Sequence, residues 1–244
     1  MAASDGGVTV IIPTFDEGES IGAVVGELPR DTVDRVIVVD GGSSDQTVAE
    51  ARRAGAEVIS VGRGYGLACL AGADATNPDD IVVFMDGDGA DDPSAIARMV
   101  AAIRSGAFEF VIGSRVLGTR ERGSMKNHQV LAGLATGWLL GVMYGVRYTD
   151  MCAFRALRRD TLLGLGMREL TYGWNLEMQI RVARARLRVL ELPVAYRRRA
   201  GGASKVAGNL RGSIKAGARI MTTFARVALE PAAGRQASVV RAGN

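Results

Sequence analysis

Short apolar runs alternate with amphipathic segments along the first half of the chain. The apolar runs are rich in β-branched residues and predict five strands, at residues 8–13, 35–40, 56–61, 80–86 and 108–114. The segments between them have the i, i+3, i+4 apolar spacing of helices, and most of them end at Gly or Pro. Apolar strands separated by helices are typical of a mainly parallel sheet with both faces covered, so the pattern predicts an α/β fold.

The alternation stops after Arg115. Residues 130–146 carry no charged side chain and have a glycine at every fourth position, which favours a helix that packs closely on a neighbour. Because a bilayer span needs about 20 apolar residues, we expect this helix to be buried or interfacial rather than transmembrane. Further along, the pattern predicts an extended segment entering a short helix at 148–160, a helix at 174–187 and a strand at 188–199.

The C-terminal part predicts one more helix, at residues 209–229, with two different sides. At about 100° per residue, one side carries Leu210, Ile214, Met221, Phe224 and Ala228, and the other carries Arg211, Lys215, Arg219 and Arg226. We therefore divide the chain into a main domain at 1–206, a basic amphipathic helix at 207–229 and a tail at 230–244 that we expect to be disordered.

Composition and charge narrow the class of protein. The 244 residues are 48% hydrophobic, which is enough for one core. The 30 Lys and Arg residues outnumber the 26 Asp and Glu residues, so the net charge is +4. Basic residues concentrate between Arg181 and Arg226, which indicates an anionic partner for that part. Cys69 and Cys152 form no CxxC motif, and no signal-peptide pattern precedes Val8, so we expect a cytoplasmic protein with reduced thiols.

Polar residues follow the predicted strands at the points where parallel strands end, which is where such sheets bind ligands. Asp86 and Asp88 are two residues apart in an extended segment, so both carboxylates can hold one hard divalent ion through oxygen. The alternative is a solvated Asp-Gly turn in which Asp92 or Ser94 caps the next helix. The metal site is favoured because the other strand ends are also polar: Asp16 and Glu17 after the first, Asp40 after the second, Arg63 after the third, and Ser114 and Arg115 after the fifth.

Two glycine-containing loops have open interpretations. Residues 62–66, GRGYG, fail the G-x-G-x-x-G dinucleotide pattern in both registers, and they suit a phosphate-binding loop with Arg63 or a tight strand-to-helix turn equally well. Residues 196–205 cluster Arg197, Arg198, Arg199 and Lys205, which suits a loop closing over a pyrophosphate, although most such runs are solvated turns.

Other classes of enzyme are disfavoured. His128 is the single histidine, which excludes a multi-histidine zinc site, and no G-x-S-x-G elbow supports a serine hydrolase. The chain also lacks a P-loop motif. We expect His128 to be a polar residue at a helix start.

Several blocks stand in a recognisable order between Val8 and Val206: VIIPTFDEGESI, VIVVDGGSSDQT, GRGYGLACLAGADAT, VVFMDGDGADDP, VIGSR, YTDMCAFRALRRD, YGWNLEMQIRVARA and YRRRAGGASKV. In this order and spacing the chain resembles glycosyltransferase family 2, and most of all its branch of dolichyl-phosphate mannose synthase and polyprenyl-phosphate glycosyltransferases. The resemblance implies a GT-A fold, a nucleotide-diphosphate sugar donor, Mg or Mn, and inversion at the anomeric carbon.

The resemblance also implies roles for individual residues. Asp16 and Asp40 would contact the nucleoside, Asp86 the ribose and the metal, and Asp88 the metal. Arg115 and Arg199 would meet phosphate groups, and Asp150 and Glu177 would meet the donor sugar or the acceptor. The implied catalytic residues are Asp88, Asp150, Glu177 and Arg199, and the implied donor-binding residues are Pro13, Asp16, Glu17, Asp40, Arg63, Gly64, Asp86, Arg115 and Lys205.

We therefore expect an enzyme that transfers a hexose from a UDP- or GDP-sugar to a polyprenyl phosphate, with the helix at 209–229 lying peripherally on the inner face of the cytoplasmic membrane. A hydroxyl acceptor would need Asp150 or Glu177 as a base, whereas a phosphate acceptor would not. The alternatives are a soluble family member acting on a small-molecule or glycan hydroxyl, and a non-catalytic nucleotide-sugar-binding module. Ala90, where relatives often have Gln, makes the last one conceivable. We expect no nucleic-acid partner, and homo-oligomerisation stays open.

Overall fold

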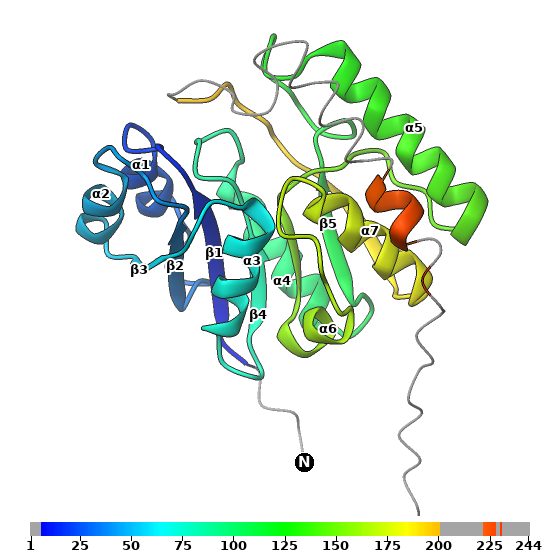
Figure 1. Ribbon diagram of the computed structural model, residues 1–244, viewed down its shortest axis with the longest axis horizontal. Coiled ribbons are helices and arrows are strands. Elements are labelled where there is room, and N and C mark those ends of the chain that lie inside the picture. Colours follow the sequence, from blue (N-terminus) through cyan, green and yellow to red (C-terminus); the bar gives the residue numbers. More distant parts are fainter. Residues whose placement is uncertain (1–5, 201–221, 228–229, 231–244) are drawn as a thin grey trace, which may run out of the picture.

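A seven-stranded sheet in the order β3-β2-β1-β4-β6-β5-β7 forms the centre of the protein (Figure 1). The computed structural model describes residues 6–200, 222–227 and 230. The strands are β1 (Val8–Thr14), β2 (Arg35–Asp40), β3 (Glu57–Ser60), β4 (Ile81–Phe84), β5 (Phe110–Ser114), β6 (Arg155–Arg158) and β7 (Val189–Pro193). The five strands expected in the first half are confirmed, as is the α/β class.

The sheet is mainly parallel, as predicted, with one exception. β3, β2, β1 and β4 pair in parallel, and so do β5 and β7. β6 runs antiparallel to both of its neighbours, β4 and β5. All seven residues of β1 are buried, because a central strand is covered on both faces, and this explains its continuous apolar sequence.

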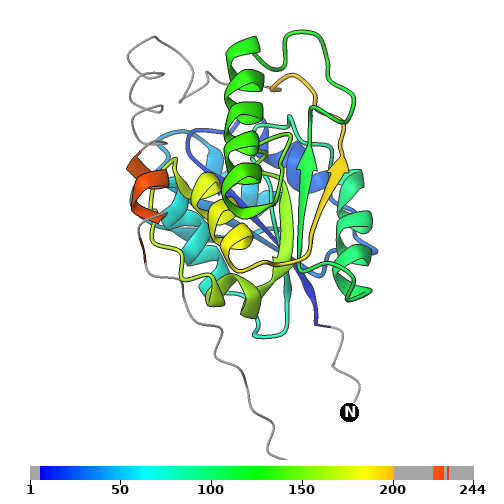
Figure 2. The same cartoon turned by 90° about the vertical axis from the view of Figure 1, so that its right-hand side faces the viewer.

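Helices cover both faces of the sheet. Figure 2 shows α3 and α7 on one face and α4 on the other. The bounds are α1 (Ile21–Gly26), α2 (Thr47–Arg53), α3 (Tyr65–Asp74), α4 (Ile96–Arg104), α6 (Arg159–Gly164) and α7 (Trp174–Arg184), with a short 3₁₀ turn η1 (Pro93–Ala95) before α4. Asp92 caps that turn by accepting a hydrogen bond from the Ser94 backbone N–H at 3.1 Å.

The predicted helix at 130–146 is α5 (Asn127–Tyr144), which runs along the outside of the molecule (Figures 1 and 2). It ends at Gly145, whose φ of 77° is the left-handed conformation that glycine adopts without strain. A Cβ added at Gly137 would lie 1.7 Å from the Tyr148 carbonyl oxygen, so glycine is required for α5 to pack this closely. Among the described residues, every helix is too short or too polar to cross a bilayer.

Part of the predicted C-terminal helix is described. Residues 222–227 are helical, and Phe224 packs against the core of the domain. The rest of the predicted helix at 209–229 and most of the tail at 230–244 lie outside the described residues. The division of the chain at residues 206 and 229 therefore stays a prediction.

Candidate functional site

Two neighbouring loops at the carboxyl end of the sheet are joined by Asp16, Asp40 and two serines. Asp40, the last residue of β2, accepts hydrogen bonds from the backbone N–H groups of Gly42 and Ser43 and from the Ser43 hydroxyl. The Ser43 hydroxyl oxygen also accepts from the Asp16 N–H at 2.8 Å, and Asp16 accepts from the Ser44 N–H at 2.8 Å. The two aspartates are therefore brought together, and their carboxylates are oriented by the turn that follows β2.

The acidic turn after β4 brings three carboxylates into one place. Asp86 is partly buried, and Asp88 and Asp91 are buried. The Asp91 side chain accepts from the Asp86 N–H at 3.2 Å, and the Tyr65 hydroxyl donates to Asp86 at 3.2 Å. Asp88 accepts from the Ala90 N–H at 2.9 Å, so the turn itself fixes the orientation of these carboxylates.

Burial and neighbouring charges raise the pKa values of Asp86 and Asp91. Burial, and then the charge of Asp88, raise the pKa of Asp86 to about 6. Burial, and then the charges of Asp86 and Asp88, raise the pKa of Asp91 to about 8. Three carboxylates with so little solvent are stabilised by a nearby positive charge. Sequence reasoning quoted Asp91 within the acidic run but assigned it no role, and its burial is what distinguishes it from a solvated turn residue.

Arg199 supplies one such charge, from the loop that follows β7. Its Nε donates to Asp88 at 2.6 Å, and its guanidinium lies 4.0 Å from the Glu17 carboxylate. The loop lies over the acidic turn through two backbone bonds, from Arg197 N–H to the Ala90 carbonyl at 2.8 Å and from Ala200 N–H to the Asp88 carbonyl at 3.0 Å. The structure thus brings together Glu17, Asp88 and Arg199 from three separate segments.

Arg115, the first residue after β5, forms the second cationic element. Its guanidinium binds both carboxylate oxygens of Asp150 at 2.7 Å, and its N–H donates to the same carboxylate at 3.0 Å. The guanidinium also stacks over the Tyr196 ring, 4.9 Å from its centroid. Asp150 is 2% exposed and pairs with Arg115 through both carboxylate oxygens, and its expected place beside the sugar or the acceptor stays a prediction.

Glu191 and Thr149 form hydrogen bonds that fix the segment next to Asp150, and the sequence analysis identified neither residue. The Glu191 carboxylate accepts from the Thr149 N–H at 2.8 Å and from its hydroxyl at 3.1 Å. The Thr149 hydroxyl oxygen lies 2.6 Å from that of Ser114, the last residue of β5. No sequence signal marks Glu191, because a single acid within a strand reads as an ordinary exposed residue.

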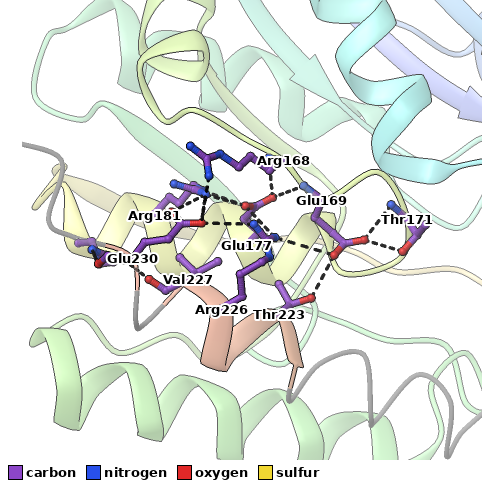
Figure 3. Close-up of polar contacts among 10 residues, drawn as sticks. Arg168, Glu169, Thr171, Glu177, Arg181, Thr223, Arg226, Val227 and Glu230 are labelled. Carbon is purple, nitrogen blue, oxygen red and sulfur yellow. Dashed lines mark hydrogen bonds and ion pairs between the residues drawn. The ribbon is translucent and has the colours of Figure 1, made fainter.

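Glu177 lies apart from this site, in the first turn of α7, and its side chain is fully buried (Figure 3). One carboxylate oxygen accepts from the N–H groups of Arg168 and Glu169 at 3.0 and 2.6 Å. The other accepts from Arg181 at 2.9 Å and from Arg226 at 3.1 Å. Glu177 therefore joins α7 to the helical residues 222–227, and its expected role as a base stays a prediction.

The remaining predicted residues are more dispersed. Arg63 is exposed, and its guanidinium lies 4.0 Å above the Phe15 ring, so the loops that follow β3 and β1 are in contact. Gly64 serves packing, since a Cβ there would come within 2.6 Å of the Leu170 carbonyl oxygen, which favours the tight-turn interpretation of residues 62–66. Pro13 is buried within β1, and Lys205 lies outside the described residues.

The chemistry of the acidic turn suits a hard divalent ion. Asp86 and Asp88 offer the oxygen ligands that Mg²⁺ and Mn²⁺ prefer, and burial together with neighbouring carboxylates raises the pKa values of Asp86 and Asp91. Within residues 6–200, 222–227 and 230, no three potential ligands already stand in metal-binding geometry. A bound ion would therefore complete its coordination with water and with oxygens of a ligand, as Mg²⁺ does when it binds with substrate phosphates.

Comparisons with known proteins agree that the chain is similar to glycosyltransferases. Residues 9–164 match the model of Glycosyl transferase family 2. An uncharacterised glycosyltransferase of Mycobacterium tuberculosis is 38% identical over 212 residues, covering 85% of this chain and 93% of that protein. The undecaprenyl-phosphate mannosyltransferase of Micrococcus luteus is 33% identical over 220 residues, covering 84% and 89%.

The fold also matches a solved structure. Glucosyl-3-phosphoglycerate synthase from Mycobacterium tuberculosis, in complex with Mn²⁺, uridine diphosphate and glucosyl-3-phosphoglycerate, superposes with a TM-score of 0.71 at 21% identity. The match covers 93% of this chain and 81% of that one. At this level of identity the likeness concerns the fold, and it confirms the expected GT-A architecture.

Proposed function

Because the chain belongs to glycosyltransferase family 2, we propose that it is a metal-dependent, inverting enzyme that transfers a hexose from UDP- or GDP-hexose to a polyprenyl phosphate. The undecaprenyl-phosphate mannosyltransferase relative supports the lipid acceptor, and the Mn²⁺ complex of the structural neighbour supports the metal. The enzyme would work on the inner face of the cytoplasmic membrane, where a lipid phosphate is presented to the site.

One observation carries the proposal: buried carboxylates and two arginines meet at the carboxyl end of the sheet. Asp86 and Asp88 would hold the divalent ion, which neutralises the donor diphosphate and stabilises it as a leaving group. Arg199 is placed to move from Asp88 to the diphosphate oxygens once the ion binds. Asp16 and Asp40 lie at the neighbouring strand ends and would accept hydrogen bonds from the nucleoside.

A phosphate acceptor is favoured because of the contacts that the two candidate bases, Asp150 and Glu177, make. Asp150 is bound on both oxygens by Arg115, and Glu177 lies in the α7 network, so neither is placed to take a proton from a hydroxyl. A phosphate monoester needs no base, because its second pKa is about 6 and it is already a dianion near neutral pH. Its oxygen would attack the anomeric carbon as the bond to the diphosphate breaks, giving a sugar phosphodiester and a nucleoside diphosphate.

The experiment is a transfer assay with UDP- and GDP-hexoses, Mn²⁺ or Mg²⁺, and a polyprenyl phosphate in detergent. Asp88→Asn should lower kcat by at least about a hundredfold, as loss of a main electrostatic element does. Asp92→Asn is the matched control, because Asn also caps η1, and it should stay within about twofold of the wild type. Equal rates for Asp88→Asn and wild type, or turnover in EDTA, would refute the proposed site.

A soluble acceptor is the second candidate, and the neighbour's complex with glucosyl-3-phosphoglycerate favours testing it. The same assay with phosphoglycerate in place of the lipid separates the two. Transfer to phosphoglycerate alone would move the enzyme to the soluble class. If the protein binds the donor but releases no nucleotide with either acceptor, it is a non-catalytic nucleotide-sugar-binding module.

A further inference from the structure

Helix α5 buries one side and exposes the other, although it is apolar all round. Its covered side carries Gly133, Gly137 and Gly141, which pack on Asp150, Tyr148 and Arg147 respectively. Its opposite side exposes large apolar side chains that the described residues leave uncovered: Leu131 (66% exposed), Leu134 (41%), Trp138 (61%), Val142 (63%) and Met143 (44%).

Four of these side chains form one continuous stripe, and Met143 lies outside it. At about 100° per residue, Leu131, Leu134, Trp138 and Val142 fall within an arc of about 80°. Single exposed apolar residues are ordinary, but a stripe along three turns of one helix marks an interaction surface. Trp138 adds an aromatic ring with one polar N–H, the kind of side chain enriched where protein meets the lipid headgroup region.

We propose that this α5 stripe docks on an anionic lipid bilayer and presents the candidate site to a lipid acceptor. The inference rests on the proposed function, which requires the site to meet a polyprenyl phosphate. It assigns the membrane contact to α5 rather than to the helix predicted at 209–229. The described end of that helix faces the protein, since Arg226 binds Glu177 and Phe224 packs on the core.

The charges around the stripe fit an anionic surface. Residues 117–148 contain four basic side chains, Arg120, Arg122, Lys126 and Arg147, all exposed. The one acid in this range, Glu121, accepts a hydrogen bond from the Arg198 N–H at 2.7 Å. Anionic headgroups attract such residues, whereas a symmetric pairing of two copies would bring like charges together at both ends of the stripe.

The position of α5 links the stripe to the chemistry. A Cβ at Gly133 would lie 3.7 Å from the Asp150 Cα, so the covered side of the helix rests on the residue that orients Arg115. A helix has a diameter of about 10 Å with its side chains, so a bilayer touching the stripe lies about one helix diameter from the site. That separation lets a lipid phosphate reach Arg115 while its chain stays in the bilayer.

The test is flotation of the full chain with vesicles containing 30% or so of an anionic lipid, together with tryptophan fluorescence. The chain has two tryptophans, and Trp174 is fully buried, so an emission shift to the blue on vesicle addition reports Trp138. We expect binding and a blue shift for wild type, and at least tenfold weaker binding to neutral vesicles. Trp138→Glu/Val142→Glu should lose binding at least tenfold.

The matched control is Leu163→Glu, at a site 45% exposed on α6, at the opposite end of the molecule from α5 (Figures 1 and 2). It should bind vesicles like wild type. Circular dichroism and sedimentation of each variant check the fold and the oligomeric state. Unchanged vesicle binding by the double variant overturns the proposal. So does a wild-type dimer that the double variant splits, with no vesicle binding by either.

Transfer assays with two acceptors distinguish a failure of this inference from a failure of the proposed function. With a short-chain, water-soluble prenyl phosphate, the double variant should retain wild-type rates. With long-chain polyprenyl phosphate in anionic vesicles, it should lose at least tenfold. If the double variant keeps the wild-type rate in vesicles, the docking surface is wrong and the proposed function is unaffected. If the wild type transfers sugar to neither acceptor, the proposed function is wrong.

Discussion

Glu177→Gln tests whether this buried carboxylate is structural or catalytic. The substitution keeps the shape of the side chain and removes its charge, while the carboxylate now accepts two backbone N–H groups and two arginines (Figure 3). Breaking a buried ion pair by removing one partner costs about 3–5 kcal/mol. Arg181 and Arg226 both retain Glu230 as a partner, at 2.8 and 3.3 Å, so we expect the lower end of that range.

For a protein of this size, about 3 kcal/mol corresponds to a fall in Tm of about 6–12 °C. Thermal denaturation followed by circular dichroism measures it, and kcat is measured at 20 °C, where the variant remains folded. The control is Glu57→Gln, which breaks the exposed pair with Arg35 and should cost less than about 1 kcal/mol. We expect kcat of Glu177→Gln within about threefold of wild type. An unchanged Tm with a hundredfold loss of kcat would refute the structural role.

Two further predictions concern the packing of α5 and the orientation of Arg115. Gly137→Ala should lower Tm by several degrees, since its Cβ would meet the Tyr148 carbonyl oxygen, whereas Gly26→Ala, with open space around its Cβ, should raise Tm slightly; equal shifts would contradict the packing. Asp150→Asn should lower kcat at least about tenfold, because the amide NH2 group cannot accept a hydrogen bond and one of the two bonds to the Arg115 guanidinium is lost. An unchanged kcat in the transfer assay would remove Asp150 from the site.

Much of the parallel part of the fold is predictable from the sequence because β1, β2, β4 and β5 are almost wholly buried and read as apolar runs. The position of β6 in the sheet, between β4 and β5, could not be predicted. Its four residues include Arg155, which is fully buried and donates to the carbonyl groups of Ala153, Cys152 and Asn175. An arginine satisfied by backbone carbonyls within a central strand has no signature in a hydrophobicity pattern, so an antiparallel insertion between β4 and β5 is not visible.

The candidate site divides in the same way. Asp86 and Asp88 were proposed as metal ligands because they stand two residues apart after a strand, and Arg199 was proposed from the basic run at 196–205 and from the family resemblance; these roles stay predictions. The role of Glu177 was taken from the family resemblance, and no pattern in the sequence showed that its carboxylate would bind Arg181 and Arg226. Tyr65, which donates to Asp86, gave no signal, since a tyrosine at a helix start reads as packing.

The central claim is that the acidic turn binds a divalent ion together with a nucleotide diphosphate. Isothermal titration of UDP and GDP into the protein, in Mn²⁺ and in EDTA, measures this directly. We predict that one of the two nucleotides binds at least tenfold more tightly in Mn²⁺, and that Asp88→Asn abolishes the difference while Asp92→Asn preserves it. Equal affinity in Mn²⁺ and in EDTA for the wild type would contradict the account.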